Sequence, residues 1–215
     1  MEYASALDLQ EALVARRLVG GDDVLLLLEH PPVYTLGRGG DPAFLGDAAM
    51  SDVPVVRTSR GGQVTYHGPG QLVGYPIVDL HGHRLDVRWY VRRLEETLIR
   101  ALAALGVPAE RRDGAPGVWT GGAKIASIGI ALRRWVTWHG FALNVAPDVS
   151  PFERITPCGL SGVRMTSVAR EGGPAAVDVV ADVVLAAFVE TFGYSRCASL
   201  SEADAASDGA AEVAS

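Results

Sequence analysis

The chain has 215 residues, of which 48% are hydrophobic, 20% charged and 7% aromatic. This composition is ordinary for a globular domain and excludes collagen-like, coiled-coil and wholly disordered chains. The formal net charge is −6, from 25 acidic and 19 basic residues, so no basic surface for nucleic acid is expected. Two cysteines, Cys158 and Cys197, are too few for a disulfide scaffold.

The length predicts a single domain over residues 1–197, followed by an acidic tail over 198–215 that we expect to be disordered. No apolar stretch reaches 18 residues, which excludes a membrane-spanning helix. The first residues carry Glu2 and no basic region before an apolar run, unlike a signal peptide. The expected location is therefore the cytoplasm, where both thiols would be reduced.

Three long helices are predicted, over residues 3–19, 86–105 and 175–192. Glycines that follow directly end the first two, and Asp86 is expected to cap the second. Strands are predicted over 24–29, 33–36, 53–57, 63–67, 72–80, 118–119, 124–132 and 135–145. Pro76 should place its strand at an edge or a bulge, and Arg133 and Arg134 should turn the last two strands into a hairpin. The pattern predicts an α+β fold with a mixed or largely antiparallel sheet.

The segment RGGQVTYHGPGQ, residues 60–71, contains four glycines in twelve residues. Such a loop lets the backbone approach a ligand closely and turn its N–H groups toward it. The segment matches neither a phosphate-binding loop nor a dinucleotide fingerprint. It is either a ligand loop, which the polar pair Tyr66 and His67 favours, or a glycine-rich hairpin.

Lys124 is the only lysine among the 19 basic residues. A lysine can lose its proton when it is buried, which arginine cannot do. It begins an apolar strand, in which alternation predicts that Lys124, Ala126 and Ile128 share one face and Ser127 and Gly129 the other. Two interpretations of Lys124 remain open: a functional lysine, or a surface lysine on an edge strand.

Cys158 stands in the turn ITPCGLSG, between a proline and two glycines. Buried structural cysteines usually occupy apolar faces of regular elements, whereas nucleophilic thiolates occupy exposed, electropositive places. Cys158 is therefore a candidate nucleophile, with a thiol of no function as the alternative; Cys197, beside the acidic tail, is not a candidate. The two cysteines form no zinc-ligand pattern, so neither a metal site nor a cofactor is predicted.

Several stretches together resemble the lipoyl(octanoyl) transferases: LLLLEHPPVYTLGR, RGGQVTYHGPGQLVGYPIVDL, KIASIGI, RWVTWHGFALNV and PCGL. The resemblance runs from about residue 3 to residue 194 with the motifs in order. It implies the fold of the biotin and lipoate protein ligase catalytic domain. It also implies transfer of an octanoyl or lipoyl group from acyl carrier protein to a lysine of lipoyl domains, including those of 2-oxoacid dehydrogenase complexes and the glycine cleavage H protein.

By position, Cys158 resembles the acyl-thioester nucleophile of this family, and Lys124 resembles its partner. The resemblance implies substrate binding by three runs of residues: Arg60, Gly61, Gly62, Gln63, Val64, Thr65, Tyr66 and His67; Ser127, Ile128 and Gly129; and Gly140, Phe141 and Ala142. Tyr66, Leu72, Ile128 and Phe141 are candidates for the walls of an acyl slot. Backbone N–H groups at Gly159 and Leu160 or in the glycine-rich loop could bind the oxyanion.

Other functions stay open on the sequence alone. The same fold could serve an ATP-dependent lipoate ligase, which needs no cysteine, or an amidotransferase that moves acyl groups between protein domains. A non-catalytic lipoyl-domain binder is a further reading, as is a hydrolase with His67 or His139 beside Cys158. His67 either orients a group in the site or closes a hydrogen-bond network in its loop. Arg38, Arg57 and Arg164 are candidates for contact with acidic protein partners.

Overall fold

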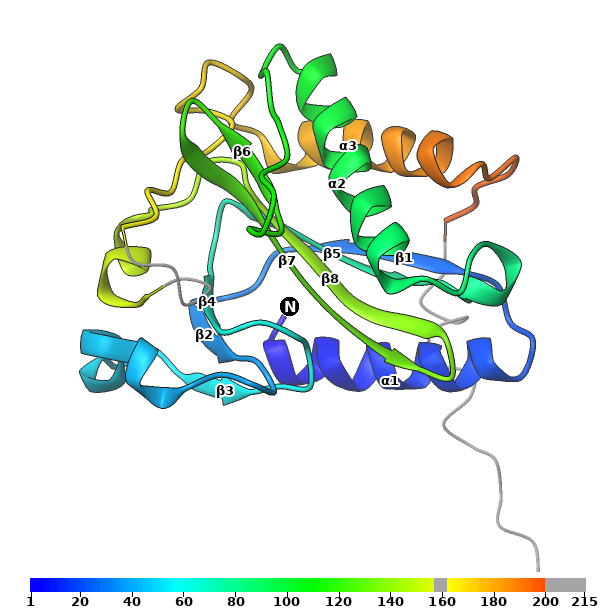
Figure 1. Cartoon of the computed structure of the whole chain (residues 1–215), viewed down its shortest axis with the longest axis horizontal. Helices are drawn as coiled ribbons and strands as arrows, with labels where there is room; N and C mark the ends of the chain where they lie inside the picture. The colour runs from blue at the N-terminus through cyan, green and yellow to red at the C-terminus, as the bar shows by residue number, and fades with distance from the viewer. Residues whose placement is uncertain (157–161, 200–215) are drawn as a thin grey trace, which may run out of the picture.

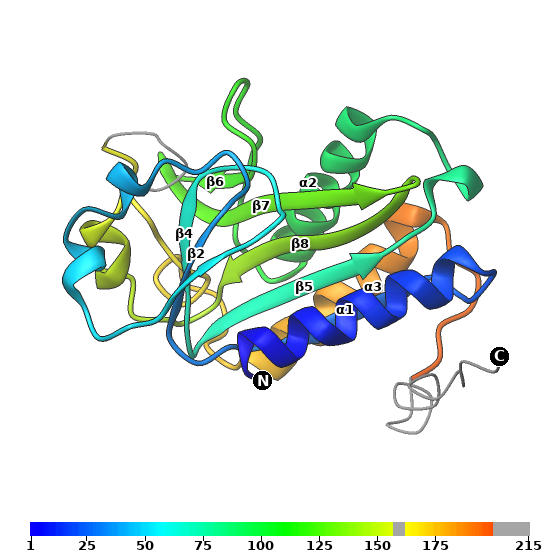
Figure 2. The ribbon, with the colours of Figure 1, turned by 90° about the horizontal axis from the view of Figure 1, so that it is seen from below.

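The computed structural model describes residues 1–156 and 162–199, arranged as three layers (Figure 1). Helices α2 (Val87–Ala104) and α3 (Val177–Phe192) form one outer layer, and a five-stranded sheet forms the middle. Helix α1 (Tyr3–Leu18) and a three-stranded sheet lie on the opposite side, as the view from below shows (Figure 2). No described helix is long and apolar enough to cross a membrane.

The five-stranded sheet has the order β1–β5–β8–β7–β6, and each of its pairings is antiparallel. Its strands are β1 (Val24–Leu28), β5 (Gln71–Ile77), β6 (Val118–Thr120), β7 (Ala123–Arg133) and β8 (Val136–Asn144). In the smaller sheet, β2 (Val33–Leu36) pairs in parallel with β3 (Val55–Arg57) and antiparallel with β4 (Val64–His67). Short 3-10 helices are η1 (Pro42–Met50), η2 (Leu80–Gly82) and η3 (Ser150–Arg154). The predicted α+β fold is confirmed.

Helix α2 shows why the local predictions succeed. The Asp86 carboxylate accepts hydrogen bonds from the backbone N–H groups of Arg88 and Trp89 at 2.9 and 3.0 Å, which caps the helix as predicted. Gly106 follows the helix with φ of +79°, a left-handed conformation that glycine adopts without steric cost. The apolar stripe of α2, including Leu94 and Leu98, is fully buried against the sheet and α3.

Three local predictions need correction. Pro76 lies in an interior strand and not at an edge, since β5 stands between β1 and β8. Its pairing with β8 nevertheless stops at Gly74, and the Thr137 hydroxyl donates to the Pro76 carbonyl at 2.8 Å and accepts from the Val78 N–H at 3.0 Å. The Thr137 side chain thus supplies hydrogen bonds to backbone groups of β5 and the residue after it, where Pro76 interrupts the pairing between strands.

The hairpin between β7 and β8 turns one residue later than predicted, at Arg134 and Trp135, whose φ angles are +52° and +68°. Two positive φ angles are typical of the two-residue turn that matches the twist of a hairpin. The strict alternation predicted for β7 is also wrong. Val118 pairs with Ala126 while Trp119 pairs with Lys124, so β7 bulges at Ile125, and Ile125 and Ala126 both join the core.

Candidate active site

A pocket lies between the two sheets and the first residue of α1, and encloses about 480 Å³ of empty space, part of it open to solvent. Its walls come from α1, from residues 60–67, and from β5, β7 and β8. Of the residues that the sequence pointed to, twelve line it: Arg60, Gly62, Gln63, Val64, Thr65, His67, Ser127, Ile128, Gly129, Gly140, Phe141 and Ala142.

Two residues of the predicted binding runs do not line this pocket, Gly61 and Tyr66. The Tyr66 ring packs instead into a second cluster against Tyr34 and Phe152. Leu72, a candidate for the slot wall, lies in the core between the sheet, α2 and α3. Alternation along β5 explains the position of Leu72, because its neighbour Val73 lines the pocket and adjacent strand residues point to opposite faces.

The glycine-rich segment rests directly on the hairpin of β7 and β8. The Gly61 N–H donates to the Ile130 carbonyl at 2.8 Å. A Cβ atom at Gly129 would approach the Gly61 carbonyl oxygen at 3.0 Å and the Arg60 Cδ at 3.1 Å. Glycine at 129 therefore permits the close approach that forms this wall of the pocket.

Arg60 is buried at the pocket wall, and its guanidinium binds the neighbouring strand β2. Its Nε and Nη2 donate to the Thr35 hydroxyl at 3.2 and 2.8 Å, and Nη2 also donates to the Thr35 carbonyl at 2.7 Å. Arginine keeps its charge in any protein environment. A permanent positive charge therefore lies beside the histidines of the pocket.

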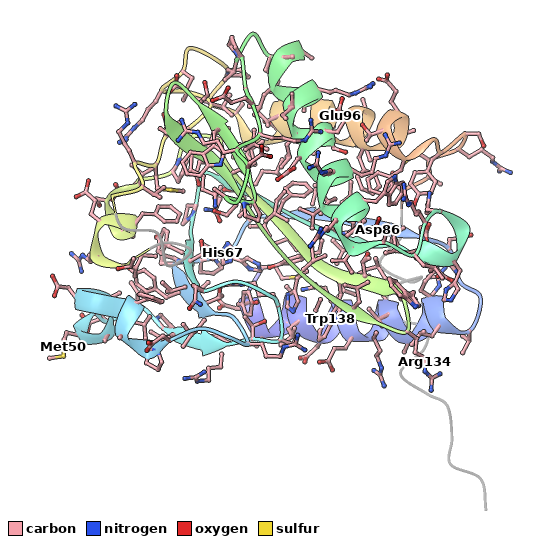
Figure 3. The ribbon with its side chains drawn as sticks, viewed as in Figure 1. Met50, His67, Asp86, Glu96, Arg134 and Trp138 are labelled. Carbon is pink, nitrogen blue, oxygen red and sulfur yellow. The ribbon has the colours of Figure 1, made fainter. Side chains whose placement is uncertain are left out.

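His67 lies at the centre of the molecule, while Met50 and Arg134 lie toward its two ends (Figure 3). Burial lowers the pKa of the His67 imidazole to about 3, with a further lowering by the charge of Arg60, so the ring is neutral at pH 7. Its Nδ1 lies 2.7 Å from the Gln71 Oε1, and its Nε2 lies 3.4 Å from the Thr35 hydroxyl. The ring thus closes a hydrogen-bond network, one of the two roles proposed for it.

Lys124 is 1% exposed, which rules out the reading of a surface lysine. Its Nζ lies 5.5 Å from the centroid of the Trp119 ring, a cation–π distance. The segment after the turn ITPCGLSG runs alongside it in parallel. The Lys124 N–H donates to the Arg164 carbonyl at 2.8 Å, and the Lys124 carbonyl accepts from the Thr166 N–H at 3.0 Å. Lys124 itself precedes the pocket-lining Ser127 by three residues on β7.

Cys158 lies outside the described residues, as do Gly159 and Leu160, so the predicted nucleophile and one predicted oxyanion site are untested. The chain on either side is described. Ile155 and Met165 pack in the same cluster as Tyr66, and the Thr156 N–H donates to the Phe44 carbonyl at 2.8 Å. Cys197 is exposed. The predicted tail, beyond residue 199, is also outside the described part of the chain.

Three further residues line the pocket and were not predicted: Tyr3, Val73 and Tyr75. A fourth, His139, was considered only as a partner of Cys158 in a hydrolase. His139 has φ of +55° within β8, and its Nε2 lies 3.0 Å from the Ser59 hydroxyl. Burial, together with the charge of Arg60, lowers its pKa to about 4. No periodicity marks Tyr3, which reaches the pocket only because α1 packs against β5 and β8. Among the described residues, no three metal-ligating side chains gather.

The described residues form an α+β domain with a partly apolar slot, and the strand β7 that lines this slot also carries the buried Lys124. Residues 2–189 match the lipoyl protein ligase A/B catalytic domain family, and the chain belongs to this family. An octanoyltransferase of Gloeobacter violaceus is 53% identical over 89% of this chain and 86% of its own length. An octanoyltransferase of Geobacter sulfurreducens is also 53% identical, over 87% of this chain and 79% of its own.

Among solved structures, the putative lipoate protein ligase Ta0514 of T. acidophilum has a TM-score of 0.74 and 21% identity. The match covers 87% of this chain and 79% of that one. A likeness at this identity concerns the fold alone, and it confirms the predicted fold class. The relatives at 53% identity confirm the predicted family and enzyme class, an octanoyl-transferring acyltransferase of the lipoylation system.

Proposed function

We propose that this protein transfers an octanoyl group from acyl carrier protein to a lysine of lipoyl domains through a thioester on Cys158, with Lys124 as its partner. The observation that carries the proposal is the pocket itself. The glycine-rich segment, β7 and β8 converge on one slot, and the strand that contributes Ser127 to it also carries the buried Lys124.

The slot suits an acyl chain because much of its wall is apolar, with Val64, Val73, Ile128 and Phe141 among the lining residues. Each methylene that an acyl chain buries contributes about 0.8 kcal/mol. Seven carbons beyond the carbonyl would therefore supply several kcal/mol of binding without a charged contact.

The proposed reaction has two steps. In the first, the Cys158 thiolate attacks the carbonyl carbon of the donor thioester, a new C–S bond forms, and the bond to the carrier thiol breaks. In the second, the acceptor lysine amine attacks the enzyme thioester, a C–N bond forms, and the Cys158 thiolate leaves. In the first step, Lys124 takes the proton of the Cys158 thiol and then gives a proton to the departing carrier thiolate. In the second step, Lys124 takes the proton of the attacking amine.

Both the position and the charge of Lys124 support this role. Its backbone is hydrogen-bonded to Arg164 and Thr166, which follow Cys158 by six and eight residues. An ammonium near a thiol favours the thiolate, which is the nucleophilic form. The cytoplasmic location belongs to the same proposal and rests on the sparse use of cysteine.

The test is intact-protein mass spectrometry after mixing with octanoyl-loaded acyl carrier protein, without ATP. We expect one octanoyl adduct that hydroxylamine removes and that Cys158→Ala lacks. Cys197→Ser is the matched control and should form the adduct like the wild type, because its thiol is exposed and remote in sequence from the site. An adduct on the Cys158→Ala protein, or none on the wild type, would contradict the mechanism.

The ATP-dependent ligase reading makes the opposite prediction. It needs octanoate, ATP and magnesium, and it leaves no thioester on the enzyme. An amidotransferase would form the adduct from an octanoylated protein domain and not from acyl carrier protein. The same mass measurement with each donor in turn therefore separates the three.

A further inference from the structure

A continuous chain of buried hydrogen bonds connects the pocket to the strand position of Lys124. It starts at a guanidinium, passes through a hydroxyl, an imidazole and two side-chain amides, and ends at a backbone carbonyl. Its members are, in order, Arg60, Thr35, His67, Gln71, Asn144 and Thr166. Each of these residues is at most 8% exposed.

The direction of every bond in the chain is determined by its two ends. The Asn144 amide donates to the Thr166 carbonyl at 2.9 Å, so its Oδ1 is the acceptor for Gln71 at 3.0 Å. The Gln71 amide also donates to the Tyr66 carbonyl at 3.1 Å, which leaves only its Oε1 for His67. Because carbonyls only accept, both amide orientations follow without ambiguity.

The orientation of Gln71 determines the tautomer of His67. Since the Gln71 Oε1 can only accept, the imidazole carries its proton on Nδ1 and keeps a lone pair on Nε2. At the other end, Arg60 can only donate, so the Thr35 hydroxyl accepts from it and has its own proton left for the His67 Nε2. The Gln71 end therefore places the proton on Nδ1, and the Thr35 end accommodates the same tautomer.

Other charged and titratable groups surround His67. The Tyr3 ring of α1 stacks on it with centroids 6.1 Å apart, and the His30 ring meets it edge-on at 5.7 Å. The charge of Arg60 and the neighbouring His30 and His139 disfavour the imidazolium. A proton on His67 would add a second positive charge beside Arg60 in the slot.

We propose that Gln71, itself held by Asn144, is a positioning residue that keeps His67 as the neutral Nδ1–H tautomer, so that the slot accepts an uncharged acyl chain. The effect on acyl binding rests on the proposed function, whereas the tautomer does not. The same chain ends on Thr166, whose N–H binds the Lys124 carbonyl, so Gln71 and Asn144 also join the slot wall to the lysine strand.

The direct test is nitrogen-15 NMR of the histidine rings in the full-length protein, with the His67 signals assigned by comparison with His67→Asn. We expect a single Nδ1–H tautomer that does not titrate between pH 5 and pH 8. An Nε2–H tautomer, or an imidazolium at pH 7, overturns the proposal. This measurement needs neither substrate nor activity, so it stands even if no octanoyl adduct forms.

Two variants of Gln71 provide a matched pair. Gln71→Leu removes the acceptor for the Nδ1–H, and we expect a mixture of tautomers and a KM for the octanoyl donor at least tenfold higher, with a smaller change in kcat. Gln71→Glu, in its protonated form, keeps an acceptor oxygen for the Nδ1–H, and its single O–H replaces one of the two N–H donations of the amide. It should retain the tautomer and a KM within about threefold of the wild type.

A purely structural role for Gln71 predicts a different result. Both variants would then lose stability, and the tautomer of whatever remains folded would not correlate with KM. A Gln71→Leu protein that is folded, keeps the Nδ1–H tautomer and binds the donor normally would also overturn the proposal.

Discussion

The two faces of the five-stranded sheet are both buried, but they are built differently. On the α2 and α3 face, the core is a large apolar cluster, with Leu94, Leu98 and Val184 fully buried. The face toward α1 and the small sheet buries His67 and Gln71 as well as Val73 and Ala142. Apolar contacts are non-directional and tolerate repacking, whereas a buried polar group must find a partner at a fixed distance and angle. The first face therefore supplies stability, and the second holds groups in a defined arrangement.

The strongest test of this contrast is Lys124→Met, which keeps the volume and removes the ammonium. We expect a loss of about 10²–10⁴-fold in octanoyl transfer, the usual contribution of a general acid–base group. Single-turnover transfer to a lipoyl domain measures it. Urea unfolding should show that the variant stays folded, and transfer at the wild-type rate would remove Lys124 from the mechanism.

On the other face, Leu98→Ala should act on stability alone. Leu98 is fully buried between α2, the sheet and α3, so the truncation should lower the free energy of unfolding by about 2–5 kcal/mol. Denaturant unfolding measures the change. The rate per folded molecule should be unchanged, and a large loss of activity in a fully folded sample would show that the two faces are not separable in this way.

As the pH falls, the free energy of unfolding should decrease first through the buried histidines of the polar face and only at lower pH through the carboxylates. The pKa values of His67 and His139 are lowered by burial to about 3 and about 4, against roughly 6.5 in an unfolded chain. Below pH 6.5 the unfolded state binds more protons, so the free energy of unfolding falls as the pH drops from about 6.5 toward 4. The slope is at most about 1.4 kcal/mol per pH unit for each histidine.

Urea unfolding at pH 7.5, 6 and 5 measures this slope. The variant His67→Asn should show a smaller slope than the wild type over the same range. Carboxylates with a lowered pKa, such as those of Asp79 and Glu96, lower the free energy of unfolding mainly below about pH 5. A stability that stays constant from pH 7.5 to pH 5 would contradict the neutral, buried state of these rings.

The smallest expected effect is that of Gly129→Ala. The added Cβ would lie 3.0 Å from the Gly61 carbonyl oxygen, so the glycine-rich loop must shift by a few tenths of an ångström away from β7. A loss of packing comparable to one methylene, about 0.8 kcal/mol, raises the KM for the octanoyl donor about fourfold. Gly82→Ala is the control, since its added Cβ meets nothing within 4 Å. Equal KM values for the two variants would mean that the slot wall does not contact the acyl chain.

Much of the fold could be predicted from local signals. Helical periodicity, the Asp86 cap and the glycines after α1 and α2 placed the helices to within one or two residues. The errors concern positions where a neighbour overrides the local pattern. Pro76 stands in an interior strand because the Thr137 side chain satisfies the interrupted ladder, and the bulge at Ile125 changes the face of Lys124 relative to Ala126.

The predictions for the candidate site also divide into those that local signals support and those that depend on tertiary packing. The three runs that form the slot could be selected from their glycines and from the resemblance of several motifs to one family, and twelve of their fourteen residues line the pocket. Tyr3 carries no such signal, since it reaches the slot only through the packing of α1 on the sheet, whereas Tyr75 reaches it from the interior strand β5. Cys158, although it was singled out from its turn, lies outside the residues described by the structure, and its role stays a proposal.

The sequence by itself determined most of the helices and strands, the fold class and the family. Each of these depends on periodicity, on local backbone preferences or on motifs in order along the chain. Only the tertiary structure decided that Lys124 is buried and that His67 is a neutral link between Arg60 and Asn144. Burial and hydrogen-bond direction depend on residues up to 131 positions apart, Thr35 and Thr166, which no local pattern relates.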